Sequence, residues 1–181
     1  MDVQIKLIDD LDAEERAQLD AMEKLCFPAW SGGVESTEHK DEVQIEWSGS
    51  HWAVLGKIDG RLVSQVGLIK REVKVGGVPV WVGGVGGVMT HPAYQRQGLA
   101  ATLLAETAVF MARDLKVDFG MLVCSHAKIP YYEKSGYRLV NGETRCASYG
   151  KTIVFPEPVM VSALSEKAWP DGPVDMAGLP W

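Results

Sequence analysis

Cysteine and histidine are scarce in this chain of 181 residues, which has three cysteines and four histidines. Cys26, Cys124 and Cys146 are an odd number and share no metal-ligand spacing, so neither a disulfide framework nor a zinc site is expected, and we expect no metal. The lack of paired cysteines suits a reducing compartment, the cytoplasm. The N-terminal segment MDVQIKLIDD is acidic and alternating, unlike a secretory signal.

Basic residues are outnumbered, with 18 Lys and Arg against 24 Asp and Glu, a net charge of −6 at pH 7. Phosphate backbones bind basic surfaces, so we expect no nucleic-acid partner. Charges are also absent from residues 75–95, the one segment that resembles a membrane span. Its six glycines and two prolines suit strands and turns rather than a lipid-facing helix, so we expect no membrane partner.

The charge and the glycines are unevenly distributed along the chain. Residues 1–60 carry 14 acids and 5 bases, whereas residues 61–134 carry 9 bases and 5 acids. Six of the 19 glycines fall within residues 76–87. We therefore expect an anion to bind in the basic, glycine-rich middle of the chain. The length fits one domain that spans residues 1–181.

Local patterns predict an α/β (α+β) fold with a mixed central sheet of about seven strands and helices on both faces. Apolar runs predict strands at residues 3–7, 51–58, 61–73, 78–90, 119–123, 137–140 and 152–161. Helices are expected from the N-cap Asp12 to about Cys26, over 36–46, from Gly98 onward and near Pro130. Asp59-Gly60 and Gly76-Gly77 mark hairpin turns.

The glycine tract Gly83–Gly87 lies inside an expected strand. It is not a dinucleotide-binding fingerprint, because Met89 stands where the third glycine of G-x-G-x-x-G would be. Glycine within a strand indicates a bulge, or a backbone that another group approaches closely. A weakly packed edge strand is the alternative.

The segment Gln95–Ala100 joins that strand to the helix that follows. A helix N-terminus offers unpaired N–H groups and a partial positive charge, Gly98 lets an anion approach the backbone, and Arg96 adds a permanent charge. This arrangement can bind a pyrophosphate. It is not a P-loop, because Gly-Lys-Ser/Thr is missing.

Two motifs in order resemble those of the GNAT acetyltransferases. The stretch Val88–Ala100 matches the family's acetyl-coenzyme A (acetyl-CoA) pattern with Gln95, Gly98 and Ala100, and Tyr132–Tyr137 matches its Tyr-Glu-x-x-Gly-aromatic element. The resemblance covers roughly residues 3–160. It implies the GNAT fold, splayed at the cofactor site, with acetyl-CoA as cosubstrate.

The resemblance also implies which residues hold the cofactor. The backbone of Val88, Met89 and Thr90 would pair with the pantetheine arm, and a bulge nearby would make room for the thioester. Ser125 stands where many members place a cofactor-contacting polar residue. The pyrophosphate would lie at the loop and first helical turn, formed by Gln95, Arg96, Gln97, Gly98, Leu99, Ala100 and Ala101.

Acetyl transfer to an amine needs a proton donor for the departing thiolate, and Tyr132 is the candidate, since a phenol is protonated at neutral pH. The alternative is that Tyr132 only packs behind the cofactor. No general base is evident, because Gly86 stands where many members carry Glu. His91 and His126 stay open as bases and Cys124 as a nucleophile.

Within the family, the chain resembles the aminoglycoside 2′-N-acetyltransferases in its length, in residues 125–137 and in its Ala-Gly-x-x-Trp ending. Their acceptor acids correspond here to Gly86, Tyr149 and Leu179, and Ala29-Trp30-Ser31 replaces a Gly-Asp-Phe-like segment. The implied acceptor-site residues are Trp30, Gly86, His126 and Trp181.

The expected function is direct transfer of an acetyl group from acetyl-CoA to a primary amine of a small molecule, aminoglycoside-like or another cationic amine. A protein or peptide N-acetyltransferase and a non-catalytic acyl-CoA sensor are the alternatives. A third class is an interaction protein that uses exposed Trp30, Trp47 and Trp169. Expected partners are the amine substrate and, as a homodimer, a second copy of the chain.

Overall fold

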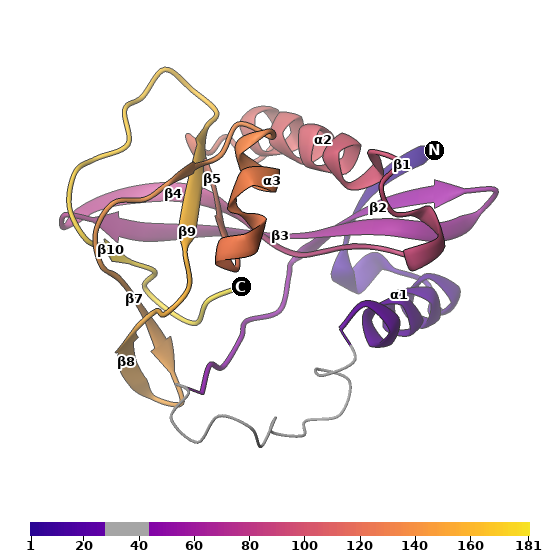
Figure 1. Ribbon diagram of the computed structural model, residues 1–181, viewed down its shortest axis with the longest axis horizontal. Coiled ribbons are helices and arrows are strands. Elements are labelled where there is room, and N and C mark those ends of the chain that lie inside the picture. The colour runs from indigo at the N-terminus through magenta and orange to yellow at the C-terminus, as the bar shows by residue number, and fades with distance from the viewer. Residues whose placement is uncertain (28–43) are drawn as a thin grey trace.

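The computed structural model describes residues 1–27 and 44–181 (Figure 1). Three α-helices are present in this part of the chain: α1 (Ala13–Cys26), α2 (Leu99–Arg113) and α3 (Ile129–Glu133). The strands are β1 (Asp2–Leu7), β2 (Trp52–Ile58), β3 (Arg61–Val75), β4 (Val78–Thr90), β5 (Phe119–Val123), β6 (Arg138–Leu139), β7 (Thr144–Ser148), β8 (Lys151–Val154), β9 (Val159–Ala163) and β10 (Val174–Asp175). Short 3₁₀ turns lie at Ile8–Asp10, Pro92–Tyr94 and His126–Lys128.

All ten strands belong to one mixed sheet, with the path β6-β9-β5-β4-β3-β10-β7-β8. The long antiparallel hairpin β3–β4 is its centre, and the parallel pair β4–β5 is joined through α2. The outer edge of β3 is shared: β2 pairs with its first half and β10 with its last two residues. β1 in turn pairs with β2.

The helices cover both faces of the sheet, as Figure 1 shows for α1 and α2 on opposite sides of β3. The α2 face buries Leu103, Leu104 and Met111 against β3 to β5. On the other face, α1 packs Met22 near Leu55 and Met89. The C-terminal tail covers the rest of that face, where Trp181 joins the core. The predicted α/β fold with helices on both faces is therefore confirmed.

The strands β4 and β5 diverge after a short parallel contact. Their pairing runs only from Val82, opposite Phe119, to Val85, opposite Leu122, whereas β4 continues to Thr90. The pairing of β4 with β3 shifts register at the same level, where Gly87 and Val88 oppose the single residue Val66. Gly87 has a φ of 53°, the left-handed conformation of a G1-type bulge. The predicted bulge therefore falls at the end of the glycine tract.

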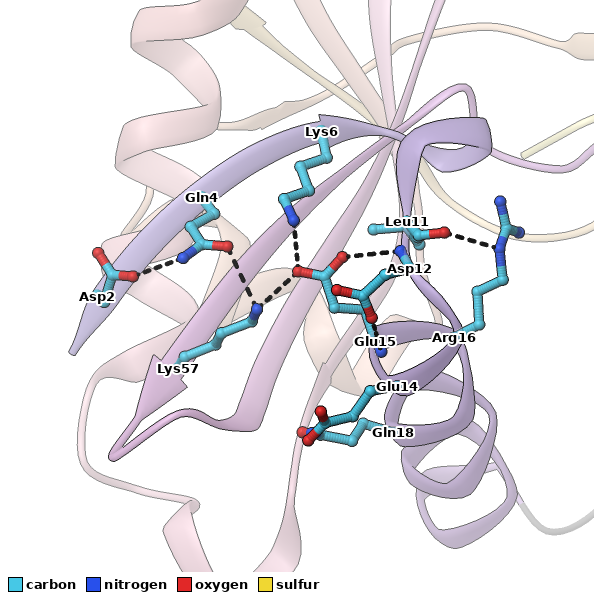
Figure 2. Close-up of polar contacts among 10 residues, drawn as sticks. All are labelled: Asp2, Gln4, Lys6, Leu11, Asp12, Glu14, Glu15, Arg16, Gln18 and Lys57. Carbon is cyan, nitrogen blue, oxygen red and sulfur yellow. Dashed lines mark hydrogen bonds and ion pairs between the residues drawn. The ribbon is translucent and has the colours of Figure 1, made fainter.

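The start of α1 is held by a capping box. The Asp12 carboxylate accepts from Glu15 N (2.8 Å), and the Glu15 carboxylate accepts from Asp12 N (3.1 Å). Glu15 is buried and also receives Lys6 Nζ (2.6 Å) from β1 and Lys57 Nζ (2.7 Å) from β2 (Figure 2). These hydrogen bonds, Lys57 first, lower the pKa of Glu15 to about 2. One carboxylate thus ties α1 to two strands.

The C-terminal half differs from expectation. The single strand predicted for residues 152–161 is two strands, β8 and β9, because Phe155–Pro158 leaves the sheet around Pro156 and Pro158. The sequence did not predict β7 and β10: β7 pairs both with the adjacent β8 and with the distant β10, and β10 forms only by pairing with β3 and β7. Of the helix predicted for 36–46, residues 44–46 are not helical and residues 36–43 lie outside the described part.

The described residues contain neither a candidate membrane-spanning helix nor a candidate metal cluster. No helix among them is both long and apolar enough to cross a membrane. No cluster of three His, Cys, Asp or Glu side chains in residues 1–27 and 44–181 could hold a metal ion.

The Glu15 cluster predicts a pH-dependent stability. Glu15→Gln should lower the free energy of unfolding at neutral pH by about 2 kcal/mol, because two charge-assisted hydrogen bonds are weakened. The folded pKa lies below the ordinary value of 4.5, so this advantage is present above pH 4.5 and disappears as the pH falls toward 2. Urea denaturation of the wild type and of Glu15→Gln, from neutral to acid pH, measures the free energy of unfolding of each protein. A difference between the two that is the same at every pH would contradict the prediction.

Candidate functional site

A cavity of about 440 Å³ opens beside the end of β4, beyond the point where β5 diverges, a volume suited to a small-molecule ligand. Its walls come from the C-terminal end of α1, the end of β4, the first turn of α2, and the segment of residues 128–132. The lining residues are Cys26, Phe27, Val88, Met89, Thr90, Tyr94, Gln95, Arg96, Gly98, Leu99, Ala100, Ala101, Lys128, Tyr131 and Tyr132.

The first turn of α2 presents free N–H groups to this cavity. Gly98 is the N-cap residue, with a φ of 81° and no side chain to bond the first-turn amides. The N–H groups of Leu99 to Ala101 thus have no intrahelical acceptor. Arg96 also has a positive φ, 60°, which is rare for a residue with a side chain. The loop is shaped so that backbone amides and the helix dipole converge on one point, an arrangement that favours an anion.

The end of β4 contributes open backbone groups on the other side of the cavity. Met89 O accepts from Ser64 Oγ (2.9 Å) and His91 N donates to Val63 O (2.9 Å), so both residues turn their polar backbone toward β3. Successive residues of a strand turn these groups to alternate edges. Those of Val88 and Thr90 therefore face the gap that β5 leaves.

Thr90 O is held from two directions. Gln95 Nε2 donates to it (3.0 Å), and the Cys26 thiol of α1 donates to it at 3.6 Å. Gln95, predicted as a cofactor contact, thus lines the cavity and also closes the loop between β4 and α2. Cys26 fixes the end of α1 against the same carbonyl, and burial raises the pKa of its thiol.

The charged side chains that line the cavity are Arg96 and Lys128, both cations, and no Asp or Glu lies among the described lining residues. Neither cation makes an ion pair with a described residue. Two unpaired positive charges beside a helix N-terminus favour a ligand with several negative charges.

Tyr132 lines the cavity beside Tyr131 and packs against the buried Tyr137. Its ring centroid lies 5.1 Å from that of Tyr131 and 6.1 Å from that of Tyr137, both edge to face. Burial, and then the neighbouring Tyr131, Cys124 and Tyr137, raise the pKa of Tyr132 well above its usual value. The phenol is therefore protonated at neutral pH and can donate a proton or hydrogen bond.

Several predicted site residues do not line the cavity. Gln97 is exposed on the loop. Ser125, the N-cap residue of the turn His126–Lys128, and His126, its first residue, are also exposed. Gly86 lies just before the bulge, on the face covered by the C-terminal tail. Trp30 lies outside the described residues.

Trp181 is 6% exposed, and its ring lies directly over the glycine tract. A Cβ atom at Gly84 would be 2.3 Å from the Trp181 ring, and one at Gly86 would be 2.9 Å from the Trp181 carbonyl carbon. Arg71 lies over the same ring, 5.2 Å from its centroid, and donates to Leu179 O. The tail therefore occupies the space that a glutamate at position 86 would need.

The other candidate groups have structural partners. His91 Nδ1 accepts from Ala93 N (3.2 Å) and caps its own turn. Cys124 Sγ lies 3.7 Å from Met160 Sδ, and burial raises the pKa of its thiol, which disfavours a thiolate nucleophile. Trp47 packs on Phe155 and Trp169 packs edge to face on Phe119, so both are partly buried rather than free for a partner.

Five lining residues were missed by sequence reasoning: Cys26, Phe27, Tyr94, Lys128 and Tyr131. Tyr94 lies inside the quoted motif, and Lys128 and Tyr131 stand just before Tyr132, so proximity along the chain was an available signal. The end of α1 had none, because its place in the cavity depends on how that helix packs against β4.

The close approach of Trp181 to the glycine tract predicts that Gly84→Ala lowers the free energy of unfolding by about 1–3 kcal/mol, because the added methyl displaces the indole. Gly49→Ala is the matched control, since a Cβ there meets nothing within 4 Å. Urea denaturation compares the two variants, and equal stabilities would contradict this packing.

Comparisons with known proteins agree with the geometry. A family model for the acetyltransferase (GNAT) domain matches residues 9–140. No curated protein matches the sequence significantly. Among solved structures, the GNAT family N-acetyltransferase YhbS from Escherichia coli, in complex with CoA, is 17% identical, with a TM-score of 0.64 over 96% of this chain and 89% of that one.

Two further structures share the fold. A GNAT family acetyltransferase from Brucella melitensis, in complex with acetyl-CoA, is 16% identical, with a TM-score of 0.58 over 96% and 94% of the two chains. An aminoglycoside 6′-N-acetyltransferase complexed with coenzyme A is 15% identical, with a TM-score of 0.60 over 91% and 99%. The resemblance to the 2′-specific enzymes stays a prediction. On the match to most of its length, the chain belongs to the GNAT acetyltransferase family.

Proposed function

We propose that this protein is an acetyl-CoA-dependent N-acetyltransferase that acetylates a primary amine. The observation that carries the proposal is the cavity beside the end of β4. An uncapped helix N-terminus, two cations that form no ion pair with a described residue and the backbone edge of Val88 and Thr90 lie around this one space. The CoA complexes of the solved relatives support the choice of ligand.

The parts of the cavity match the parts of acetyl-CoA in chemistry and order. The amides of Leu99 to Ala101, with Arg96, suit the pyrophosphate. The backbone of Val88 and the N–H of Thr90 suit the amide-rich pantetheine arm, which would add to the sheet edge like a strand. Lys128 and Tyr131, a cation and a ring on one wall, suit the phosphorylated adenosine end.

When bound, acetyl-CoA would supply the thioester that the amine attacks. The chain's own part is to hold the two reactants together in the gap beside the bulge. A backbone N–H of residues 88–90 would stabilise the carbonyl oxygen as it gains charge. The new N–C bond forms as the C–S bond breaks, and the Tyr132 hydroxyl would give its proton to the departing sulfur.

The acceptor would approach from the side of Gly86, where the tail places the main chain of Trp181. We propose a small cationic amine as the acceptor, because one solved structure with this fold is an aminoglycoside 6′-N-acetyltransferase. An aminoglycoside-like amine fits this class, and the lysine of a protein or peptide is the second candidate. β4 carries no Asp, Glu or His, so its side chains offer no base for the amine proton.

Arg96→Glu should weaken acetyl-CoA binding by more than about tenfold, because a charge-assisted contact becomes a repulsion. The thermal upshift that acetyl-CoA produces in the wild type measures this. Arg113→Glu at the far end of α2 is the control: that side chain is 75% exposed and should leave the upshift unchanged. A wild type with no upshift at saturating acetyl-CoA would refute the proposal.

Tyr132→Phe should lower kcat by about 10²–10⁴-fold and leave acetyl-CoA affinity nearly unchanged, because only the proton donor is lost. Tyr131→Phe, its neighbour in the same wall, is the control and should retain turnover. The assay is release of free thiol against a panel of amines. Cofactor binding by the wild type with no turnover on any amine would favour the sensor alternative.

A further inference from the structure

Gln65 is a polar side chain buried inside the sheet, with 5% of its surface exposed. It lies on β3 opposite Met89, next to the register shift that creates the bulge. A buried carboxamide without hydrogen-bond partners would destabilise the fold. The partners of the Gln65 side chain therefore show which backbone groups it serves.

The carboxamide bridges the two strands where their ladder is interrupted. In the orientation that satisfies its neighbours, its nitrogen donates to Gly87 O (2.9 Å) on β4 and its oxygen accepts from Gly67 N (2.9 Å) on β3. A bulge leaves backbone groups without a ladder partner. Gln65 replaces the missing partner for one group on each strand.

The bulge also decides which residues of β4 face the cavity. With the extra residue accommodated at Gly87 and Val88, Met89 turns its backbone to β3, and Val88 and Thr90 turn theirs to the gap. A strand that slipped by one residue to remove the bulge would reverse these directions. The open groups of Val88 and Thr90 would then face β3 and be lost to a ligand.

We infer that Gln65 is a positioning residue: its carboxamide holds the β4 bulge and thereby keeps the backbone of Val88 and the N–H of Thr90 directed to the gap, where CoA would bind. The inference deepens the proposed function and rests on it only for the identity of the ligand. Gln65 itself does not line the cavity, so it acts on the ligand through Gly87 and the strand that follows.

The first test compares CoA binding by calorimetry in the full chain. Gln65→Leu, which removes both hydrogen bonds, should weaken CoA binding by about tenfold or more. Ser148→Ala is the matched control, because the buried Ser148 hydroxyl likewise bridges two backbone groups, Glu46 N and Gln44 O, far from the bulge. It should bind CoA within about twofold of wild type. Equal affinity of Gln65→Leu and wild type would overturn the inference.

The second test uses pH. In Gln65→Glu a protonated carboxyl can donate to Gly87 O and accept from Gly67 N, whereas a carboxylate has no donor. Its CoA affinity relative to wild type should therefore recover as the pH falls from about 8 to about 5, a range that burial makes accessible to a carboxyl. A residue that only filled space would give a ratio that does not change with pH, and that result would overturn the inference.

Hydrogen exchange of the Gly67 amide gives a readout that needs no ligand. In the wild type it should be as slow as that of the neighbouring ladder amide of Leu68, and about tenfold or more faster in the Gln65 variants. If the wild type does not bind CoA but shows this pattern, the proposed function fails and the role of Gln65 in the bulge stands. A fast Gly67 amide in the wild type overturns that role, even if no variant folds.

Discussion

The gap between β4 and β5 beyond Val85 is the constraint on which the candidate site depends. Two parallel strands that stayed paired would use up their backbone groups on each other. Here four paired positions are followed by five more residues of β4 that pair with no strand of the described residues on that edge. The same divergence leaves the N-terminus of α2 beside the unpaired edge of β4. A site suited to an anion therefore adjoins a strand edge to which an extended ligand could pair.

The other face of the glycine tract is shaped by the C-terminal tail. β10 enters the sheet beside β3, and the chain then returns so that Trp181 covers Gly84 and Gly86. Arg71 holds the tail through Leu179 O and the indole face and forms no ion pair with an acid in the described part of the chain. The indole of Trp181 therefore covers one side of the glycine tract, and the bulge at its end shapes the strand edge that faces the gap.

The cationic and the acidic side chains serve different parts of the structure. The cavity takes its two cations from the basic middle of the chain, Arg96 and Lys128. In the acidic first third of the chain, Glu15 has a structural role, because its carboxylate completes the capping box and also pairs with Lys6 and Lys57. These two lysines around one buried carboxylate fix the position of α1. The end of α1 then places the Cys26 thiol where it donates to Thr90 O.

Local interactions made part of this architecture predictable. Asp12 as N-cap and Cys26 as last residue of α1, the β3–β4 hairpin and the start of α2 at Gly98 all follow from capping groups and turn residues close in sequence. Most of the motif residues from Val88 to Ala101 line the cavity for the same reason: they follow one another around one loop, and only residues 91–93 and Gln97 of this range do not line it.

The sequence by itself thus determined the fold class, most elements and the loop that forms the anion site. Only the tertiary structure decided the short strands β7 and β10, the place of Lys128 and the end of α1 in the cavity, and the burial of Trp181 over Gly84. It also decided the role of Gln65, which reads in sequence as an ordinary polar residue of a strand. Each of these depends on contacts between residues distant in the chain, whose energies come from packing and shared hydrogen bonds rather than from local preference.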